Sequence, residues 1–214
     1  MEKLEGPVTA LTKAALEFGQ DHPHFARGKL QVSCGPRTGA AWYLAAVGHQ
    51  DQSYGSHGYL EHLEAVARRV SSGFPLQGDR GYQTHEDALC TALLHDLLED
   101  TEVTPEEVEE VCGARVRVWV QALTATEGNR KQRLRQTCDQ ILSIQDPGHQ
   151  VVLVLVKLAD RICNIRACWN DMDSRLFMYE KEQGLLVKRL GVIQHHCLVE
   201  PWGELDRLLG RTKK

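Results

Sequence analysis

The spacing of the apolar residues constrains the fold of this chain more than any other feature of its sequence. In residues 59–70 the apolar side chains fall at positions 59, 60, 63, 66, 67 and 70, which is the period of an α-helix. No segment alternates apolar and polar residues as a half-buried strand does. The sequence therefore predicts an all-α fold, a bundle of helices. The other predicted helices cover residues 8–18, 40–49, 85–98, 105–112, 115–124, 130–143, 150–169, 175–190 and 201–209.

Helix boundaries are marked most clearly in the middle of the chain. Thr104, Pro105 and Glu107 form the pattern of a capping box, and Gly113 is placed to end the helix that follows. Two glycine-containing segments, residues 51–58 and 71–83, predict loops.

The predicted helices divide the chain into a short first part and one main domain. Residues 1–39 hold one short helical pattern and then a stretch rich in Gly, Pro and His, so we expect an N-terminal extension packed on the domain. The domain itself is predicted to cover residues 40–210, which is an ordinary domain size.

Charge and cysteine content limit the partners and the compartment. The net charge of −4 gives the 214-residue chain no bulk attraction to nucleic acid or to an anionic membrane, and we expect neither as a partner. No apolar run reaches the roughly 18 residues of a transmembrane helix, and the first residues lack a signal core. Seven cysteines without a CxxC pair indicate free thiols in a reducing compartment, so we expect a cytoplasmic protein. The sequence leaves open whether it is a monomer or a homodimer.

The most informative segment is the end of the predicted helix 85–98. It places His95, Asp96, Glu99 and Asp100 after a run of leucine and alanine, and helical spacings of three and four would bring these groups onto one patch. Carboxylates beside an apolar core are costly unless a cation compensates them. A divalent cation is one such partner. The alternative is that Glu99 and Asp100 begin a solvated loop and that His95 is an ordinary core histidine.

Two further segments carry single groups of the same kind. His62 lies on the predicted helix 59–70, and Asp160 interrupts one of the most apolar helices of the chain. Asn164 is four residues after Asp160 and should share its face. An ion pair of Asp160 with Lys157 or Arg161 is the alternative, and we expect those pairings to have poor geometry.

Together these motifs resemble a known family. An adjacent His-Asp pair with an upstream His and a downstream Asp is similar to the metal signature of HD-domain phosphohydrolases. Over residues 40–195 the motifs resemble more closely the hydrolase domain of RelA/SpoT proteins, whose stand-alone form is the small alarmone hydrolase, including the metazoan SpoT homologue. The motifs read Tyr59-x-x-His62, His95-Asp96-x-x-Glu99-Asp100-Thr101 and Lys157-Leu158-Ala159-Asp160-Arg161-x-x-Asn164.

The resemblance implies a fold, a cofactor and a set of roles. The fold would be the HD-domain helical bundle, with His62, His95, Asp96 and Asp160 holding one divalent ion, typically Mn²⁺. Imidazole and carboxylate ligands also suit Fe²⁺ or Zn²⁺, and the absence of cysteine ligands argues against a structural zinc. The catalytic acidic pair would be Glu99 and Asp100.

Substrate contacts are implied for a further group of residues. Asn164 and Lys157 belong to the downstream motif, and Arg175 with Tyr179 resembles a pair that grips the substrate phosphates. The alternative for that pair is a surface arginine and a half-buried aromatic residue. Tyr54 could stack on a base, and His57 could reach a phosphate; each could equally be a plain loop residue.

The sequence departs from the RelA/SpoT pattern in two loops. Residues 50–59 contain no Arg or Lys, where the family has a basic element that recognises guanine, and Gly58 replaces a proline. The predicted loop 71–83 is longer than in the family. The base of the substrate is therefore left open.

Three functions follow as hypotheses. The first is a 3′-pyrophosphohydrolase that acts on (p)ppGpp or an adenine analogue. The second keeps the metal site and changes the substrate to another small phosphorylated nucleotide, such as a nucleoside mono- or triphosphate. The third is a non-catalytic, nucleotide-binding regulatory module, which would have no need for the full set of ligands together with Glu99 and Asp100.

Overall fold

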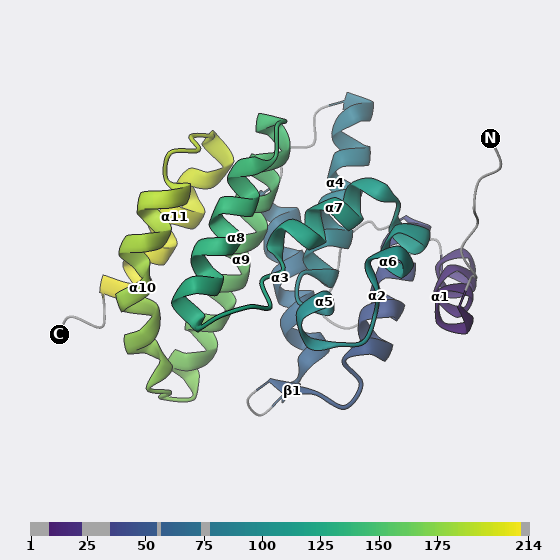
Figure 1. The fold of residues 1–214 in the computed structure, drawn as a ribbon, viewed down its shortest axis with the longest axis horizontal. Helices are drawn as coiled ribbons and strands as arrows, with labels where there is room; N and C mark the ends of the chain where they lie inside the picture. Colours follow the sequence, from purple (N-terminus) through teal and green to yellow (C-terminus); the bar gives the residue numbers. More distant parts are fainter. Residues whose placement is uncertain (1–8, 23–34, 55–56, 74–77, 211–214) are drawn as a thin grey trace.

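The computed structural model describes residues 9–22, 35–54, 57–73 and 78–210, and within this part the chain is almost entirely helical (Figure 1). The prediction of an all-α fold is confirmed. The helices are α1 (Ala10–Asp21), α2 (Pro36–Gly48), α3 (Tyr59–Gly73), α4 (Gly78–Leu94), α5 (Leu97–Asp100), α6 (Pro105–Cys112), α7 (Ala114–Leu123), α8 (Arg130–Ser143), α9 (Pro147–Asn170), α10 (Arg175–Leu190) and α11 (His196–Gly210).

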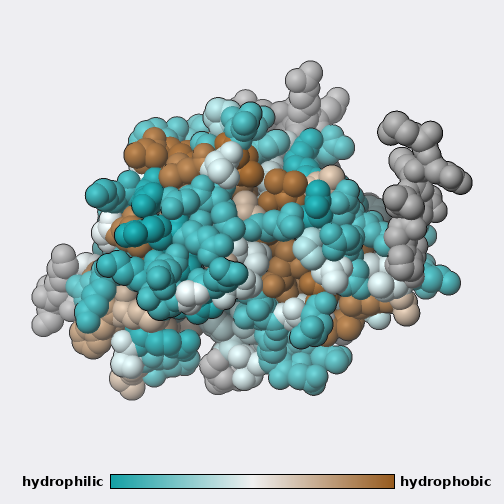
Figure 2. Space-filling model, in the orientation of Figure 1, coloured by the Kyte–Doolittle hydropathy of each residue, from teal (hydrophilic) through white to brown (hydrophobic). Residues whose placement is uncertain are grey.

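The helices form one elongated array with α1 at one end and α10 with α11 at the other (Figure 1). Helix α3 packs on both α4 and α9, and α11 also packs on α9. The fully buried side chains at the centre come from α3, α4, α7 and α9, among them Leu63, Leu93, Trp119 and Leu153. Hydrophilic residues cover most of the face in Figure 2, with hydrophobic residues showing between them.

Two short strands lie at the lower edge of this array. Strands β1 (Ser53–Tyr54) and β2 (His57–Gly58) pair antiparallel in the segment that we expected to be a plain loop. A strand of two residues is too short to show alternation in the sequence, which explains why the pattern did not reveal it.

Helix α4 differs from its prediction at both ends. It begins at Gly78, inside the predicted loop 71–83, and α3 continues to Gly73, so the connection is shorter than expected. It ends at Leu94, and a turn at His95 and Asp96 separates it from α5. The predicted continuous helix 85–98 is therefore wrong at its end. The turn is closed by the Asp96 carbonyl, which accepts hydrogen bonds from the backbone N–H groups of Glu99 and Asp100 at 3.1 Å each.

The first helices lie close together at one end of the molecule. Helix α2 begins at Pro36 rather than at residue 40, because proline suits the first position of a helix. Helix α1 packs along α2, and its N-terminal cap Thr9 donates a hydrogen bond to Glu107 of α6 at 2.8 Å. The Gly-, Pro- and His-rich stretch that was expected as a loop lies mostly outside the described residues.

Candidate functional site

The centre of the site is formed by side chains from three elements. His62 is on α3, His95 and Asp96 form the turn after α4, and Asp160 is on α9. One ligand atom from each of His62, His95 and Asp96 lies within 4.8 Å of the others. The Oδ1 atom of Asp160 lies 3.5 Å from Nε2 of His62 and 3.7 Å from Nε2 of His95. The structure thus brings together all four residues that the sequence suggested as ligands.

The His95 ring has a defined orientation. Its Nδ1 lies 2.8 Å from the carbonyl oxygen of Ala92, which can only accept, so Nδ1 carries the hydrogen. Nε2 then faces the carboxylates, 3.1 Å from Oδ2 of Asp96, buried and without a well-aligned hydrogen-bond partner among the described residues. Such an arrangement, with one nitrogen held by a backbone carbonyl, is typical of a metal-binding histidine.

Asp160 has two neighbours on its own helix. Lys157 approaches it at 3.1 Å, and the amide nitrogen of Asn164 donates to its Oδ1. The expectation that Lys157 would pair poorly with Asp160 is therefore wrong, because residues three apart on a helix are neighbours and the lysine stem is long enough. Burial alone would lower the pKa of Lys157, but Asp160 and the other nearby carboxylates raise it to about 12. Lys157 is therefore charged and offsets part of the negative charge.

The electrostatics of the cluster favour a cation. Burial opposes charge on His95, Asp96 and Asp160, yet His95 holds the pKa of Asp96 well below its usual range. Lys157 and the two histidines do the same for the pKa of Asp160. In turn Asp96 and Asp160 outweigh burial at His95 and raise its pKa to about 10. Two ionised carboxylates therefore face two imidazoles in a buried site. These donor atoms and the unpaired Nε2 of His95 fit a divalent ion, since ligands about 2.1 Å from one ion lie roughly 3 to 4 Å apart.

Tyr59 links the cluster to Asp100. Its hydroxyl donates to Oδ2 of Asp96 at 2.6 Å and lies 3.2 Å from Oδ2 of Asp100. Burial and the charge of Asp96 raise the pKa of Asp100 above its ordinary value. The sequence motif includes Tyr59 but gives it no role of its own. Its place three residues before His62, on the same helix face, is the signal that points to it.

Glu99 has different surroundings from Asp100. Its carboxylate accepts a hydrogen bond from the backbone N–H of Ala125 at 2.5 Å, just after α7. Burial raises its pKa, although the bond from Ala125 opposes the change. The expected helical spacing of four between His95 and Glu99 is interrupted, because the chain turns at residues 95 and 96. The charges of Lys157, Asp96 and Asp100 nevertheless act on Glu99.

Tyr54 covers the His62 side of the cluster. Its ring stacks on the His62 ring with centroids 4.4 Å apart, and its hydroxyl donates to the amide oxygen of Asn164 at 2.5 Å. Burial raises the pKa of Tyr54 far above its usual range, so the hydroxyl stays protonated. Tyr54 and Asn164 therefore hold each other in place. The side chain of His57 lies outside the described residues.

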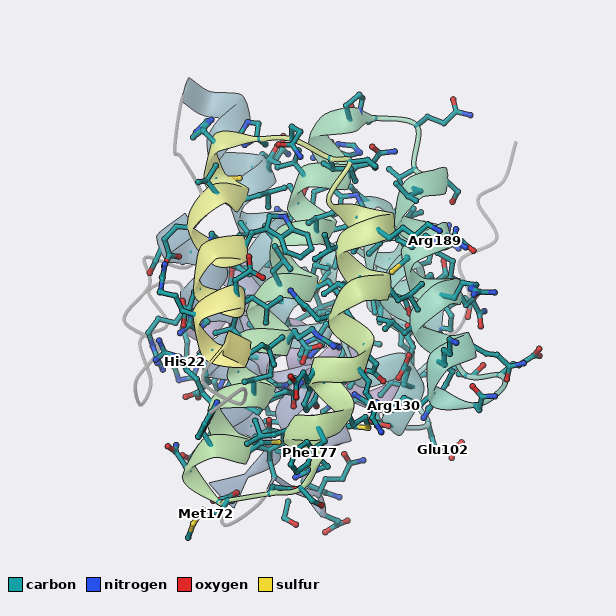
Figure 3. The ribbon with its side chains drawn as sticks, turned by 90° about the vertical axis from the view of Figure 1, so that its left-hand side faces the viewer. His22, Glu102, Arg130, Met172, Phe177 and Arg189 are labelled. Carbon is teal, nitrogen blue, oxygen red and sulfur yellow. The ribbon has the colours of Figure 1, made fainter. Side chains whose placement is uncertain are left out.

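Arg175 and Tyr179, which the resemblance implied as a pair, contact different residues. Tyr179 is buried, with the guanidinium groups of Arg130 and Arg161 5.1 and 4.9 Å from its ring centroid. Arg175 is half-exposed and donates to Asp173 at 2.6 Å. Neither arginine was predicted from the sequence as a site residue; Arg130, labelled in Figure 3, also binds Glu182 at 2.7 Å. Its only signal was its place after the Asn129 helix cap.

A cavity of about 1250 Å³ adjoins the cluster. It runs between α3, α9 and the start of α11, and His62 and Tyr54 form part of its wall. Two of its arginines, Arg69 and Arg166, share one carboxylate partner, Glu204, at 2.9 and 2.5 Å. None of the described helices is both long and apolar enough to cross a bilayer. All cysteines in the described part of the chain are free thiols.

Comparisons with known proteins identify a family model and several relatives that match this chain. The sequence model of the HD domain matches residues 41–183. The guanosine-3′,5′-bis(diphosphate) 3′-pyrophosphohydrolase MESH1 of Mus musculus is 43% identical over 109 residues, which are 50% of this chain and 54% of that protein. A guanosine-3′,5′-bis(diphosphate) 3′-pyrophosphohydrolase of Aquifex aeolicus is 32% identical over 120 residues, which are 54% of this chain and 17% of that protein. The chain thus spans about half, or less, of the length of these relatives.

A solved structure shares the fold. Its published description reads "A metazoan ortholog of SpoT hydrolyzes ppGpp and plays a role in starvation responses". It matches with a TM-score of 0.60 and 20% sequence identity, covering 82% of this chain and 95% of that chain. At this identity the likeness concerns the fold alone.

Proposed function

The chain belongs to the HD-domain family, and from this premise we propose that it is a metal-dependent phosphohydrolase that removes the 3′-pyrophosphate of (p)ppGpp or of an adenine analogue. The observation that carries the proposal is the convergence of His62, His95, Asp96 and Asp160 beside a hydrogen-bonded Tyr59 and Asp100. The two curated relatives described above bear the name of this activity.

We expect His62, His95, Asp96 and Asp160 to hold one divalent ion. Two imidazoles and two carboxylates suit Mn²⁺, which is our first choice, with Fe²⁺ or Zn²⁺ as alternatives. When bound, such an ion lowers the pKa of a coordinated water and neutralises phosphoryl charge. The charge on the site supports this, because the pKa of His95 is raised to about 10 by carboxylates that a metal would otherwise neutralise.

Asp100 is the better placed of the two predicted catalytic acids. Its carboxyl faces Tyr59 and Asp96, and its raised pKa favours a group that exchanges a proton with a reacting oxygen. Glu99 is engaged by Ala125 and serves to hold α5 against the segment after α7.

We propose that substrate phosphates bind on the Asp160 side of the cluster. Lys157 and Asn164 both contact Asp160. Burial and then the charge of Asp160 raise the pKa of Tyr179, which supports including that residue on this side. Tyr54 closes the His62 side of this group. Arg175 would have to leave Asp173 to reach a phosphate.

The identity of the base is a separate question. Residues 50–59 carry no Arg or Lys, so the basic guanine-recognition element of RelA/SpoT hydrolases is missing. This observation favours a second candidate, an HD phosphohydrolase that acts on another small phosphorylated nucleotide. We further propose that the protein is cytoplasmic and that neither nucleic acid nor membrane is a partner, in keeping with its free thiols and net charge of −4.

A substrate panel tests the proposal. Purified protein with Mn²⁺ is offered ppGpp, ppApp, dNTPs, nucleoside monophosphates and NADPH, and products are resolved by ion-exchange chromatography. We expect pyrophosphate release from ppGpp or ppApp by the wild-type protein and none by Asp96→Ala. Turnover of nothing on the panel, or equal turnover by Asp96→Ala, would contradict the proposal. Hydrolysis of another nucleotide alone would favour the second candidate.

A further inference from the structure

One buried histidine near the cluster has no role so far. His49 follows the last residue of α2, and only 3% of its surface is exposed. Its ring stacks on the ring of Tyr59, with centroids 4.5 Å apart and planes inclined by 11°. Tyr59 is the residue whose hydroxyl reaches both Asp96 and Asp100. His49 therefore packs against the residue that connects Asp96 with Asp100.

Gln52 determines which nitrogen of His49 carries the hydrogen. The amide nitrogen of Gln52 donates to the backbone carbonyl of Asp100 at 2.7 Å, and a carbonyl can only accept. This bond fixes the side-chain amide, so its oxygen is the atom that lies 2.9 Å from Nδ1 of His49. An amide oxygen also only accepts, so Nδ1 must carry the hydrogen. In the neutral ring Nε2 is then bare and can only accept a hydrogen bond.

That bare nitrogen lacks a donor. Nε2 of His49 is buried, and none of the described residues donates a hydrogen bond to it. Burial lowers the pKa of His49, outweighing the Gln52 bond and the carboxylates of Asp96 and Asp100, so the ring is neutral at neutral pH. A buried acceptor left without a partner costs about 1–3 kcal/mol, which is why such atoms usually bind an ordered water.

We propose that His49 is a catalytic residue whose Nε2 accepts a hydrogen bond from a water molecule held between the ring and the Asp96–Asp100 pair. This inference rests on the proposed hydrolase function and adds a residue to it. The surrounding contacts form one rigid unit, because Gln52 joins His49 to the Asp100 backbone and Tyr59 joins it to the Asp96 carboxylate. The water would thus be presented on the acidic side of the cluster, where Asp100 can also reach it.

The tautomer is tested first, without substrate or metal. Nitrogen-15 NMR of the metal-free protein distinguishes a ring nitrogen that carries hydrogen from a bare one, and His49 is assigned by comparison with His49→Gln. We expect Nδ1 to carry the hydrogen and Nε2 to be bare near neutral pH. A neutral ring with the hydrogen on Nε2, or a charged ring, would overturn the inference.

The role is tested by variants that differ in where they place an acceptor. His49→Phe keeps an aromatic ring for Tyr59 and removes both nitrogens. His49→Asn keeps an amide donor near the former Nδ1 position for the Gln52 oxygen but places no acceptor at the former Nε2 position, whereas His49→Gln offers an acceptor oxygen near the former Nε2 position. We expect His49→Phe and His49→Asn to lower kcat by about 100-fold, within the range of a lost contact to a reacting proton. His49→Gln should recover part of the loss.

Two readouts separate this role from a structural one. KM, and the Mn²⁺ affinity measured by calorimetry, should stay within about threefold of wild type, because no proposed ligand is altered; a threefold change corresponds to about 0.6 kcal/mol. The matched control is His85→Phe, which also removes a buried imidazole but lies on α4 beside Ser71. We expect that control to keep the wild-type kcat.

The outcomes are distinct from those for the proposed function. An unchanged kcat in His49→Phe, or a loss confined to metal affinity, would overturn the role of His49 while leaving the hydrolase intact. If the wild-type protein hydrolyses nothing on the panel, the proposed function fails, and the catalytic role of His49 fails with it whatever tautomer the NMR experiment shows.

Discussion

At the scale of single residues, the two acids after Asp96 have different hydrogen-bond partners. Asp100 lies near the Tyr59 hydroxyl that also binds Asp96, whereas Glu99 accepts a backbone hydrogen bond from Ala125. Both acids lie on the four-residue helix α5, which the turn at residues 95 and 96 separates from α4. Neighbouring carboxylates of the same motif thus have different partners, the Tyr59 hydroxyl for Asp100 and the Ala125 backbone for Glu99.

This division predicts different effects of two conservative substitutions. Asp100→Asn should lower kcat by about 100-fold or more and leave the melting temperature nearly unchanged, because it removes a proton-exchanging group. Glu99→Gln should lower kcat less and destabilise the fold by about 1–2 kcal/mol, since it weakens a charged acceptor for the Ala125 N–H. Steady-state kinetics and urea unfolding of both variants provide the check; equal kinetic losses in the two would contradict the division.

At the scale of helices, close packing and ion pairs determine how the elements fit. Helices α1 and α2 approach so closely at Gly19 that an added Cβ would lie 2.3 Å from the carbonyl oxygen of Pro36. Helices α3, α9 and α11 are joined at Glu204, which accepts two hydrogen bonds from Arg69, at 2.9 and 3.0 Å, and pairs with Arg166. These contacts hold the helices that carry His62 and Asp160.

Two glycine substitutions should have opposite signs. Gly19→Ala should destabilise the protein by about 1–3 kcal/mol, the cost of overpacking a close contact. Gly184→Ala is the matched control, because its Cβ would meet nothing within 4 Å on α10. It should stabilise by about 0.5–1 kcal/mol through the better helix propensity of alanine. Urea unfolding measures both; destabilisation of similar size in the two variants would show that the α1–α2 contact is not the cause.

The Glu204 cluster should make stability depend on pH in the acid range. Burial alone would raise the pKa of Glu204, but Arg69 and Arg166 lower it below its ordinary value. As pH falls below about 4.5 the unfolded chain takes up a proton before the native state does, so the stabilisation present at higher pH is lost.

Glu204→Gln tests this dependence because it removes the charge and keeps the shape. We expect it to be less stable than wild type by about 1–2 kcal/mol at pH 7, discounted for the exposure of Arg166. The difference should shrink towards pH 3 in urea unfolding. Glu200→Gln, on the exposed side of α11, should change little at either pH. A difference that does not vary with pH would rule out the charge as its cause.

At the scale of the whole molecule, the cluster joins parts that are far apart in sequence. His62, His95 and Asp160 come from α3, the turn after α4, and α9, so an ion bound to them would cross-link the centre of the bundle. The far end of the array carries exposed apolar side chains instead, with Met172 and Phe177 projecting near the turn between α9 and α10 (Figure 3). Because such an ion would connect three central elements, we expect its binding to raise the free energy of unfolding of the whole domain.

Metal removal should lower the stability of the entire domain. A ligand present at 100 times its Kd stabilises the native state by about 2.7 kcal/mol. For a domain of this size that corresponds to a melting temperature roughly 5–10 °C higher with Mn²⁺ than with EDTA. Asp96→Ala is the control and should melt at the same temperature in both. A wild-type melting temperature that ignores Mn²⁺ would count against the metal site.

The sequence by itself determined the fold class and which side chain types form the site. Helical periodicity predicted the all-α bundle, and the motifs around His62, His95 and Asp160 named the four residues that the structure brings together. The fold class and the residue types of the site could be predicted because helical periodicity and motif spacing depend only on positions along the chain.

Only the tertiary structure decided orientation and pairing. The turn at His95 and Asp96, the separate surroundings of Glu99 and Asp100, and the stacking of His49 on Tyr59 depend on contacts between distant segments. Such contacts determine the orientation of a side chain, and they cannot be predicted from the spacing of residues within a single helix. The segment that most resembled a simple helix end thus became the turn on which the candidate site is built.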